Sequence, residues 1–267
     1  MGADEIELLA GMRDDVPDTV RFPIRMVEIE TRTRCNRACS YCPNSTHQRP
    51  DVELPEPLYR SILAQLRELR FEGRMSFHFY NEPLLDQRLE GFIRIAREQL
   101  ERLRIVLYSN GDYLTRQRFE ALVDAGVDVL WVTNHGRSER HCSWRHDLPE
   151  RLQQHLRYQT NRNPEIFWTN RGGLLPHVVT IRQPLSVRCT ALATTLVVTA
   201  EGAVVLCYED YEGRVSLGSL HSQSIAEVWN SPRAMAIRRR LILGDRTCTL
   251  PCRGCNNIEM QTLEVID

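Results

Sequence analysis

The residues most able to do chemistry are three cysteines near the N-terminus. Cys35, Cys39 and Cys42 lie within eight residues, in the stretch "CNRACSYC". A structural zinc site uses four ligands, so a zinc ion here would need a distant fourth ligand such as His47. A [4Fe–4S] cluster normally takes four thiolates, and three from the protein leave one iron open to bind a small molecule. The spacing therefore favours a reactive iron–sulfur cluster over zinc.

A second group of cysteines lies toward the C-terminus. Its members are Cys189, Cys207, Cys252 and Cys255. Four protein thiolates close a [4Fe–4S] cluster and make it a storage site for an electron. The same four residues would also suit a structural zinc ion. Cys142 and Cys248 complete the nine cysteines of the chain. Cys248 could replace one of the four as a ligand, but we interpret it as a free thiol.

Composition excludes several other classes of protein. The 267 residues carry a formal net charge of −1, and every basic residue other than histidine is arginine. Without lysine there is no Schiff base and no Walker-type phosphate site, and no G-x-G-x-x-G supports a Rossmann hydride route. The neutral balance predicts no nucleic-acid partner. No run approaches the roughly 18 apolar residues of a membrane span, and the acidic N-terminus is not a signal peptide, so we expect a cytoplasmic protein.

Predicted strands and helices alternate along the first two thirds of the chain. Helical periodicity and β-rich composition distinguish them. Strands are expected at 26–31, 75–80, 104–110, 127–135 and 165–170, and helices at 55–70, 85–102, 115–126 and 149–159. This alternation predicts an α/β fold with a parallel sheet and helices outside it. Functional residues should then gather at the carboxyl ends of the strands.

The pattern changes near residue 185. Two β-rich runs flank Glu201-Gly202, which predicts a hairpin. Ser224 and Glu227 form a capping-box signature, and Ser231 precedes a proline at the start of a helix that should end at Gly244. The last cysteine segment has too little apolar periodicity for a helix. We place a boundary at 183–188, between an α/β domain and a small cysteine-bearing module.

Three motifs in order resemble the signature of radical S-adenosylmethionine (SAM) enzymes. They are C-x3-C-x2-C with Tyr41 before its last cysteine, "FYNEPLL" (79–85) at the end of the second strand, and "YSNGDYLT" (108–115) at the end of the third. The resemblance implies a partial (β/α)6 TIM-like barrel. The downstream cysteines, with "IAEVWNSP" between them, resemble the shortened SPASM module called Twitch. The implied organisation is an N-terminal extension at 1–24, a radical SAM core at 25–185 and a Twitch module at 186–267.

The resemblance also implies the cofactors and the residues that bind them. Two [4Fe–4S] clusters are expected, one on Cys35, Cys39 and Cys42, the other on Cys189, Cys207, Cys252 and Cys255. Residues expected to contact SAM are Tyr41, Asn81, Glu82, Pro83, Ser109, Asn110 and Asn134. Asn81 stands where the family usually has glycine, which accepts positive φ more freely. An external one-electron reductant such as flavodoxin or ferredoxin is implied as a partner.

The likeness is strongest to Twitch enzymes of aminoglycoside antibiotic assembly. It implies that an aminocyclitol or amino sugar is the substrate and that a secondary alcohol becomes a ketone. In this family a 5′-deoxyadenosyl radical removes the carbinol hydrogen. The second cluster then accepts an electron, which explains why a two-electron oxidation would use two one-electron centres.

Four residues are candidates to act on the substrate. Arg171, before two glycines in "TNRGG", could hydrogen-bond the reacting hydroxyl, although a surface arginine at a turn would look the same. Glu28 and Glu30 share one face of the first strand and could bind ammonium groups, or could face solvent. His78 could reach the same pocket or be a core histidine.

Two other functions fit some of these residues. A radical epimerase would quench the sugar radical with a thiol, for which Cys142 is the first candidate and Cys248 the second. A non-enzymatic zinc-binding module would use both cysteine groups structurally. The neutral charge and the lack of a basic-aromatic stripe argue against nucleic-acid binding by such a module.

Overall fold

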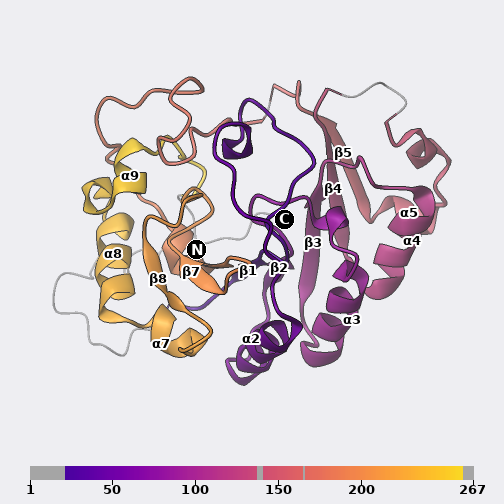
Figure 1. The fold of residues 1–267 in the computed structure, drawn as a ribbon, viewed down its shortest axis with the longest axis horizontal. Coiled ribbons are helices and arrows are strands. Elements are labelled where there is room, and N and C mark those ends of the chain that lie inside the picture. The colour runs from indigo at the N-terminus through magenta and orange to yellow at the C-terminus, as the bar shows by residue number, and fades with distance from the viewer. Residues whose placement is uncertain (1–21, 137–140, 165, 261–267) are drawn as a thin grey trace.

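A single sheet organises the part of the chain that the structure describes. The computed structural model describes residues 22–136, 141–164 and 166–260, so most of the expected N-terminal extension (1–24) lies outside the described residues. In these residues the sheet has eight strands in the order β5-β4-β3-β2-β1-β6-β7-β8 (Figure 1). The strands are β1 (Met26–Ile29), β2 (Arg74–Ser76), β3 (Arg104–Ser109), β4 (Val129–Asn134), β5 (Leu156–Thr160), β6 (Thr195–Val198), β7 (Ala203–Val205) and β8 (Ser216–Ser219).

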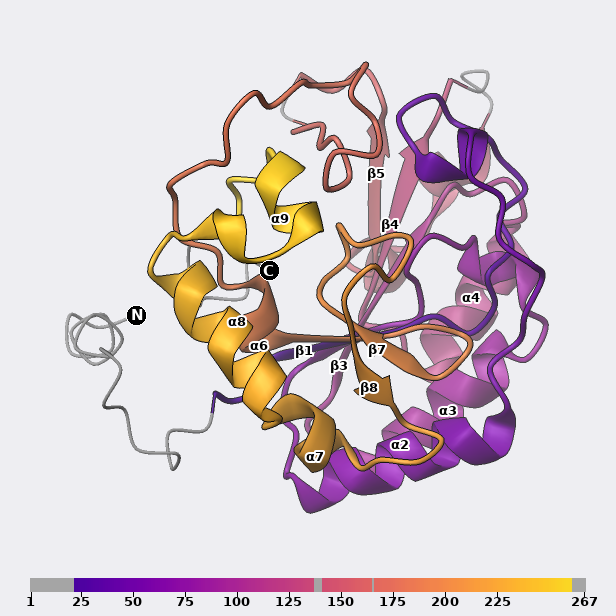
Figure 2. The same cartoon turned by 60° about the vertical axis from the view of Figure 1, so that its left-hand side comes forward.

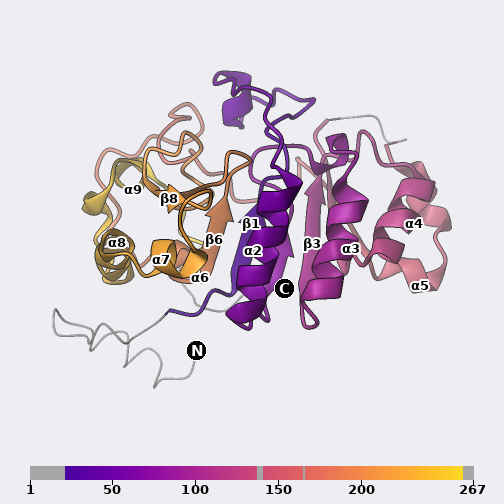
Figure 3. The same ribbon diagram turned by 60° about the horizontal axis from the view of Figure 1, so that its bottom comes forward.

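Strands β1 to β6 are all parallel, and helices cover one face of this parallel part. Every pairing from β5 through β6 is parallel. Figure 3 shows the helices α2 (Glu56–Glu68), α3 (Leu89–Gln99) and α4 (Arg116–Ala125) on one face of the sheet, and α5 (Glu150–Gln153) is a single short turn. Val27 and Ile29 of β1 are fully buried in the main hydrophobic core. The expected α/β fold is confirmed.

Local signals placed several element ends correctly. Thr115 caps α4 by accepting a hydrogen bond from the Arg118 amide at 3.1 Å, and Gly126 ends that helix with a φ of 117°. Ser224 and Glu227 form both bonds of a capping box at the start of α7 (Ile225–Trp229). Ser231 caps α8 (Pro232–Ile242). Each of these is a contact between residues close in sequence, so the sequence alone predicts it.

Two expected elements between residues 149 and 170 are wrong. The helix expected at 149–159 is only the short α5, and β5 follows it at Leu156–Thr160. The strand expected at 165–170 is absent from 166–170, which carry no regular structure, and residue 165 lies outside the described residues. Backbone pairing with β4, in the register Leu130 to Leu156, decides the position of the fifth strand. Such pairing depends on tertiary context more than on local propensity.

The hairpin and β8 extend the sheet beyond β6, and the C-terminal helices follow β8. β6 and β7 are antiparallel around Gly202, whose φ is +74° and where a Cβ would lie 2.7 Å from Leu58. After β8, Figure 2 shows α7, α8 and α9 (Leu250–Gly254) along one side of the molecule, away from α3 and α4. The expectation that the last cysteine segment forms no helix is therefore wrong in part, because the short helix α9 forms there with Pro251 in its first turn. The remaining short elements are η1 (Pro43–Ser45), η2 (Pro83–Leu85), η3 (Ser143–Asp147), α6 (Ala191–Thr194) and η4 (Arg246–Cys248).

One buried ion pair ties β1 to its two neighbours. Glu30 is fully buried and receives two hydrogen bonds from Arg49, at 2.9 and 2.5 Å. The same carboxylate accepts longer bonds from the backbone amides of Tyr80 (3.3 Å) and Ala200 (3.4 Å). Glu30 is one of the two carboxylates that were candidates to bind the substrate. Its oxygens already accept hydrogen bonds from Arg49 and from two backbone amides of the protein.

We predict that Glu30→Ala lowers the stability of the protein strongly. The change leaves the Arg49 guanidinium and two amides without their buried acceptor, and breaking a buried pair in this way costs about 3–5 kcal/mol. The control is Glu56→Ala, which removes an exposed pair with Arg60 at 2.7 Å worth about 0.3–0.5 kcal/mol. Calorimetric melting of both variants measures the difference. Equal, small shifts would contradict this role of Glu30.

Candidate active site

The first cysteine group lies in the loop that follows β1, at the carboxyl edge of the parallel strands. All three cysteines line a cavity of about 430 Å³. The loop is tightly turned, since the Cys42 amide donates to the Cys39 carbonyl at 2.9 Å and the Arg37 amide donates to the Cys35 sulfur at 3.5 Å. Three sulfurs on one wall of a cavity are a donor set that fits an iron–sulfur cluster.

An ion pair that the sequence analysis missed fixes this loop to the ends of β3 and β4. Arg37 donates two hydrogen bonds to Asp112, at 2.8 and 2.6 Å, and a third to the His135 carbonyl at 3.0 Å. Both side chains of the pair are at most 12% exposed. Asn36 adds a bond to Asp112 at 2.7 Å and receives one from Asn110 at 2.8 Å. The bidentate geometry orients the cysteine loop as well as holding it.

Glu82 connects two of the predicted motifs. Its buried carboxylate accepts hydrogen bonds from the Asn110 amide (2.7 Å), the Ser109 hydroxyl (2.7 Å) and the Leu84 amide (3.1 Å). Its own amide donates to the Arg34 carbonyl of the cysteine loop at 2.9 Å. Burial raises the pKa of Glu82, and the three donors oppose that rise. Glu82 therefore connects the cysteine loop to the segments that follow β2 and β3.

Five of the seven residues expected to contact SAM line this cavity, and two do not. Those that line the cavity are Tyr41, Asn81, Glu82, Ser109 and Asn110. The lining residues do not include Pro83 or Asn134, both of which are buried; Thr133 and His135, on either side of Asn134, line the cavity. Asn81 uses its side chain on its own loop, accepting from the Phe79 amide at 2.9 Å.

A set of aromatic rings borders the cavity beside the cysteine loop. The Tyr41 hydroxyl lies 2.5 Å from Nδ1 of His135, and the Tyr41 and Trp168 ring centroids are 4.2 Å apart. Flat rings of this kind offer a stacking surface for a heteroaromatic group. The sequence analysis does not single out Trp168, because it expects a strand at 165–170. The aromatic side chain of Trp168 is the signal that could have identified it.

Glu28, His78 and Arg171 also line this cavity, and the charge of Arg171 acts on both Glu28 and His78. Each has a buried polar atom without a hydrogen-bond partner in the described structure, namely Glu28 Oε2, His78 Nδ1 and Arg171 Nε. Burial raises the pKa of Glu28 to about 7, against the opposing charges of Arg74 and Arg171. Burial lowers the pKa of His78 to about 4, so its imidazole is neutral at neutral pH. Unsatisfied buried polar groups facing a cavity are what a polar ligand would satisfy.

Arg171 is held in an uncommon backbone conformation. Its φ is 51°, and the two glycines after it also have positive φ. A Cβ on Gly172 would lie 3.0 Å from the Glu209 carbonyl oxygen, so this turn runs close against the C-terminal module. The guanidinium lies 3.7 Å from the Glu209 carboxylate and 5.6 Å from the centre of the Tyr80 ring.

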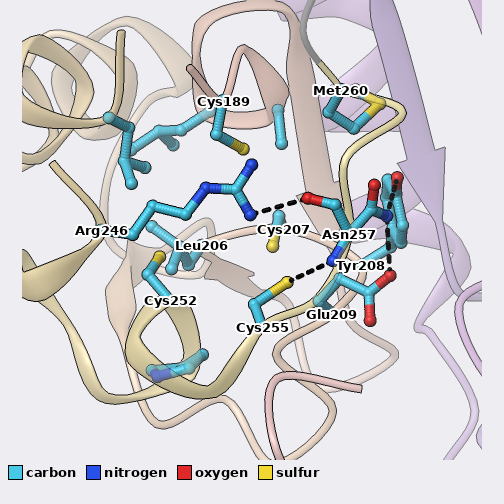
Figure 4. Close-up of a pocket in the computed structure, with 14 residues that line it drawn as sticks. Cys189, Leu206, Cys207, Tyr208, Glu209, Arg246, Cys252, Cys255, Asn257 and Met260 are labelled. Carbon is cyan, nitrogen blue, oxygen red and sulfur yellow. Dashed lines mark hydrogen bonds between the residues drawn. The ribbon is translucent and has the colours of Figure 1, made fainter. Parts of the chain in front are cut away.

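The second cysteine group surrounds a separate cavity (Figure 4). Cys189, Cys207, Cys252 and Cys255 all line it. Asn257 donates to the Glu209 carboxylate and to the Tyr208 hydroxyl, both at 3.0 Å, and its amide donates to the Cys255 sulfur at 3.4 Å. Tyr208 and Met260 line this cavity and the 430 Å³ cavity alike. The two cysteine sites are therefore separated by a wall that these two side chains share.

The two remaining cysteines differ in their surroundings: the Cys248 side chain contacts Cys252 of the four-cysteine cavity, whereas Cys142 lies beside Gly111. The Cys142 sulfur is buried and lies 3.7 Å from the Gly111 carbonyl oxygen. Neither Cys142 nor Cys248 is among the residues that line the two cavities.

Among the described residues, no three His, Cys, Asp or Glu side chains are arranged to hold a single metal ion. The four thiols around the second cavity fit an iron–sulfur cluster, which bonds each thiolate to a different iron.

Comparison with known proteins identifies the family. A family model of the radical SAM superfamily matches residues 29–161, and one of an iron–sulfur cluster-binding domain, SPASM, matches residues 189–256. The SAM-dependent 2-deoxy-scyllo-inosamine dehydrogenase of Niallia circulans is 33% identical over 244 residues, which are 91% of this chain and 96% of that protein. This chain is a radical SAM enzyme with a SPASM-type iron–sulfur module. Its class is oxidoreductase, and it uses SAM and iron–sulfur chemistry.

Other relatives of this radical SAM enzyme extend the likeness. A GTP 3′,8-cyclase of Parasynechococcus marenigrum (strain WH8102) is 34% identical over 126 residues, which are 43% of this chain and 34% of that protein. The crystal structure of BtrN in complex with AdoMet and 2-DOIA matches with a TM-score of 0.85 at 32% identity, over 92% of this chain and 98% of that one. BtrN in an open conformation matches with a TM-score of 0.71 at 29% identity, over 89% and 94%. The described helices include none long and apolar enough to cross a membrane.

We predict that Glu82→Ala weakens SAM binding by about tenfold or more. Three donors lose a charged acceptor, and one such hydrogen bond is worth roughly 1.5–3 kcal/mol. The control is Glu90→Ala, whose carboxylate accepts from Arg118 at 3.0 Å between two outer helices. Equilibrium dialysis of SAM against the anaerobically reconstituted variants measures the affinity. Unchanged binding in Glu82→Ala would contradict its role in connecting these segments.

Proposed function

We propose that this radical SAM enzyme oxidises a secondary alcohol of an aminocyclitol or amino sugar to a ketone, with two [4Fe–4S] clusters, in aminoglycoside biosynthesis. The dehydrogenase relative spans nearly the whole chain, and its name specifies an aminocyclitol substrate. The single observation that carries the proposal is the shared wall of the two cavities at Tyr208 and Met260. An electron leaving a substrate in the larger cavity has a second redox site directly across that wall.

Cys35, Cys39 and Cys42 would hold the first cluster, next to bound SAM. Together these groups supply a radical able to remove hydrogen from a carbinol carbon. The chain positions SAM through Asn81 and the loop braced by Glu82, and it offers the Tyr41–Trp168 rings as a stacking surface for the adenine. The Arg37–Asp112 pair keeps the cysteine loop in register with these groups. Their convergence on one cavity supports this assignment of roles.

Glu28 and Arg171 would bind the substrate through side chains of opposite charge. An ionised Glu28 forms a charge-assisted hydrogen bond to an ammonium group, and an ammonium in the cavity would favour the ionised carboxylate. Arg171 stays protonated, so it can polarise and orient the reacting hydroxyl but cannot serve as a base. Neutral His78 can either accept or donate a hydrogen bond to a further hydroxyl.

Cys189, Cys207, Cys252 and Cys255 would hold the second cluster, which accepts the substrate's electron. The Glu209 carboxylate lies between this cavity and Arg171. An epimerase would need a thiol facing the substrate, and neither Cys142 nor Cys248 lines the cavity. This arrangement supports oxidation rather than quenching of the radical.

The wider context of the enzyme follows from the same proposal. An external one-electron reductant, flavodoxin or ferredoxin, would reduce the first cluster, and the enzyme would work in the reducing cytoplasm. The radical SAM core would span 25–185 and the Twitch module 186–267. β6, which pairs with β1 and continues into the hairpin, would belong to the module by sequence while completing the parallel sheet.

We predict a product lighter than its substrate by two hydrogen atoms. The assay uses reconstituted enzyme, reductant and a panel of aminocyclitols and pseudodisaccharides, and mass spectrometry reads the product alongside 5′-deoxyadenosine. Cys142→Ala should give the same ketone, because this thiol lies outside the cavity wall. A product of unchanged mass carrying solvent deuterium would instead establish an epimerase.

Metal analysis of the same preparation tests the cofactors. Two clusters require about eight irons per chain, with matching sulfide. Zinc without sulfide would exclude radical chemistry and leave the zinc-module reading.

A further inference from the structure

An arginine is buried in the wall of the four-cysteine cavity. Arg246 is 2% exposed, and Figure 4 shows its guanidinium among the four labelled cysteines. It donates three hydrogen bonds to backbone carbonyl oxygens, to Val187 at 3.1 Å, Arg188 at 3.2 Å and Asn257 at 2.7 Å. These acceptors lie within two residues of Cys189, the first cysteine of the group, and of Cys255, the last. The side chain therefore joins the two chain segments that deliver the ligands.

Among the described residues, the positive charge of Arg246 has no anionic partner. All three acceptors are neutral carbonyls, and no carboxylate of the described residues forms an ion pair with it. Burying a cation without a counter-charge is costly, and an arginine cannot avoid the cost by losing its proton. A side chain that joins two loops by hydrogen bonds to their carbonyl oxygens does not have to be charged. An anionic occupant of the four-cysteine cavity would supply the counter-charge that the described residues do not.

We propose that Arg246 is the counter-charge of the auxiliary cluster and raises its reduction potential, so that the cluster can accept the substrate's electron. This inference rests on the proposed second cluster. Four thiolates outweigh the positive charge of an oxidised [4Fe–4S] core, so the occupied site is anionic. An added electron makes it more so, and a buried cation nearby favours that step in a low-dielectric setting. Cluster potentials respond to local charge and hydrogen bonding in this way.

The chain offers a matched control for the burial of an arginine. Arg238, on α8, is fully buried and donates to the carbonyl oxygens of Leu192 at 2.9 Å and Trp229 at 3.1 Å. It packs against the rings of Phe22 and Trp229 and is not among the residues that line the four-cysteine cavity. It shares with Arg246 its burial and its stapling of carbonyls, but not its place beside the cysteines.

The test is a redox titration of the auxiliary cluster alone, followed by electron paramagnetic resonance. The full chain carries Cys35→Ala, Cys39→Ala and Cys42→Ala, which remove the ligands of the first cluster. In this background Arg246→Met should lower the equilibrium constant for reduction at least tenfold, which is about 59 mV for a one-electron couple. Arg246→Lys keeps the charge and should stay near the background potential. Arg238→Met should lower the melting temperature and leave the potential unchanged.

The possible failures are distinguishable. A background protein without about four irons per chain overturns the proposed second cluster itself. Iron retained in Arg246→Met with an unchanged potential overturns only the role of Arg246. If Arg246→Met loses its iron, Arg246→Lys decides: a retained cluster at the background potential supports the counter-charge, whereas a lost cluster or a tenfold shift assigns Arg246 a purely geometric role.

Discussion

The parallel pairing of β6 with β1 is the constraint on which the site depends. It extends over four residue pairs, from Met26 opposite Thr195 to Ile29 opposite Val198. β1 leads directly into the first cysteine loop, and the hairpin that begins with β6 carries Cys207 and the residues after it. One ladder of backbone hydrogen bonds thus sets two cysteine groups, far apart in sequence, on either side of one wall. Glu30 strengthens the junction by accepting from amides on both flanking segments.

Across that wall the contacts form a continuous series. Arg171 lies near the Glu209 carboxylate, Glu209 accepts from the Asn257 side chain, and the Asn257 amide donates to the Cys255 sulfur. The Asn257 carbonyl in turn accepts from Arg246. The residue proposed to orient the hydroxyl and the residue proposed to set the potential are therefore joined through two intervening residues. This geometry would let substrate binding and electron acceptance respond to one another electrostatically.

Sequence reasoning succeeded where the determining contacts are local. The cysteine spacing, the capping box at Ser224 and the glycine end of α4 each depend on residues a few positions apart, and the family motifs carry the cofactor chemistry. It failed at β5, because strand pairing with β4 is a tertiary event. It also missed the Arg37–Asp112 pair, whose members are 75 residues apart. Asp112 stands two residues after the predicted Asn110, which was the signal available.

The central claim is that the second cysteine site takes the substrate's electron. The most direct measurement is the ratio of ketone to 5′-deoxyadenosine formed by a Cys255→Ala variant, compared with the unaltered enzyme under the same reducing conditions. The account predicts that 5′-deoxyadenosine still forms in the presence of substrate, while the ketone falls at least tenfold relative to it. An unchanged ratio, with the second site unable to bind its cluster, would contradict the account.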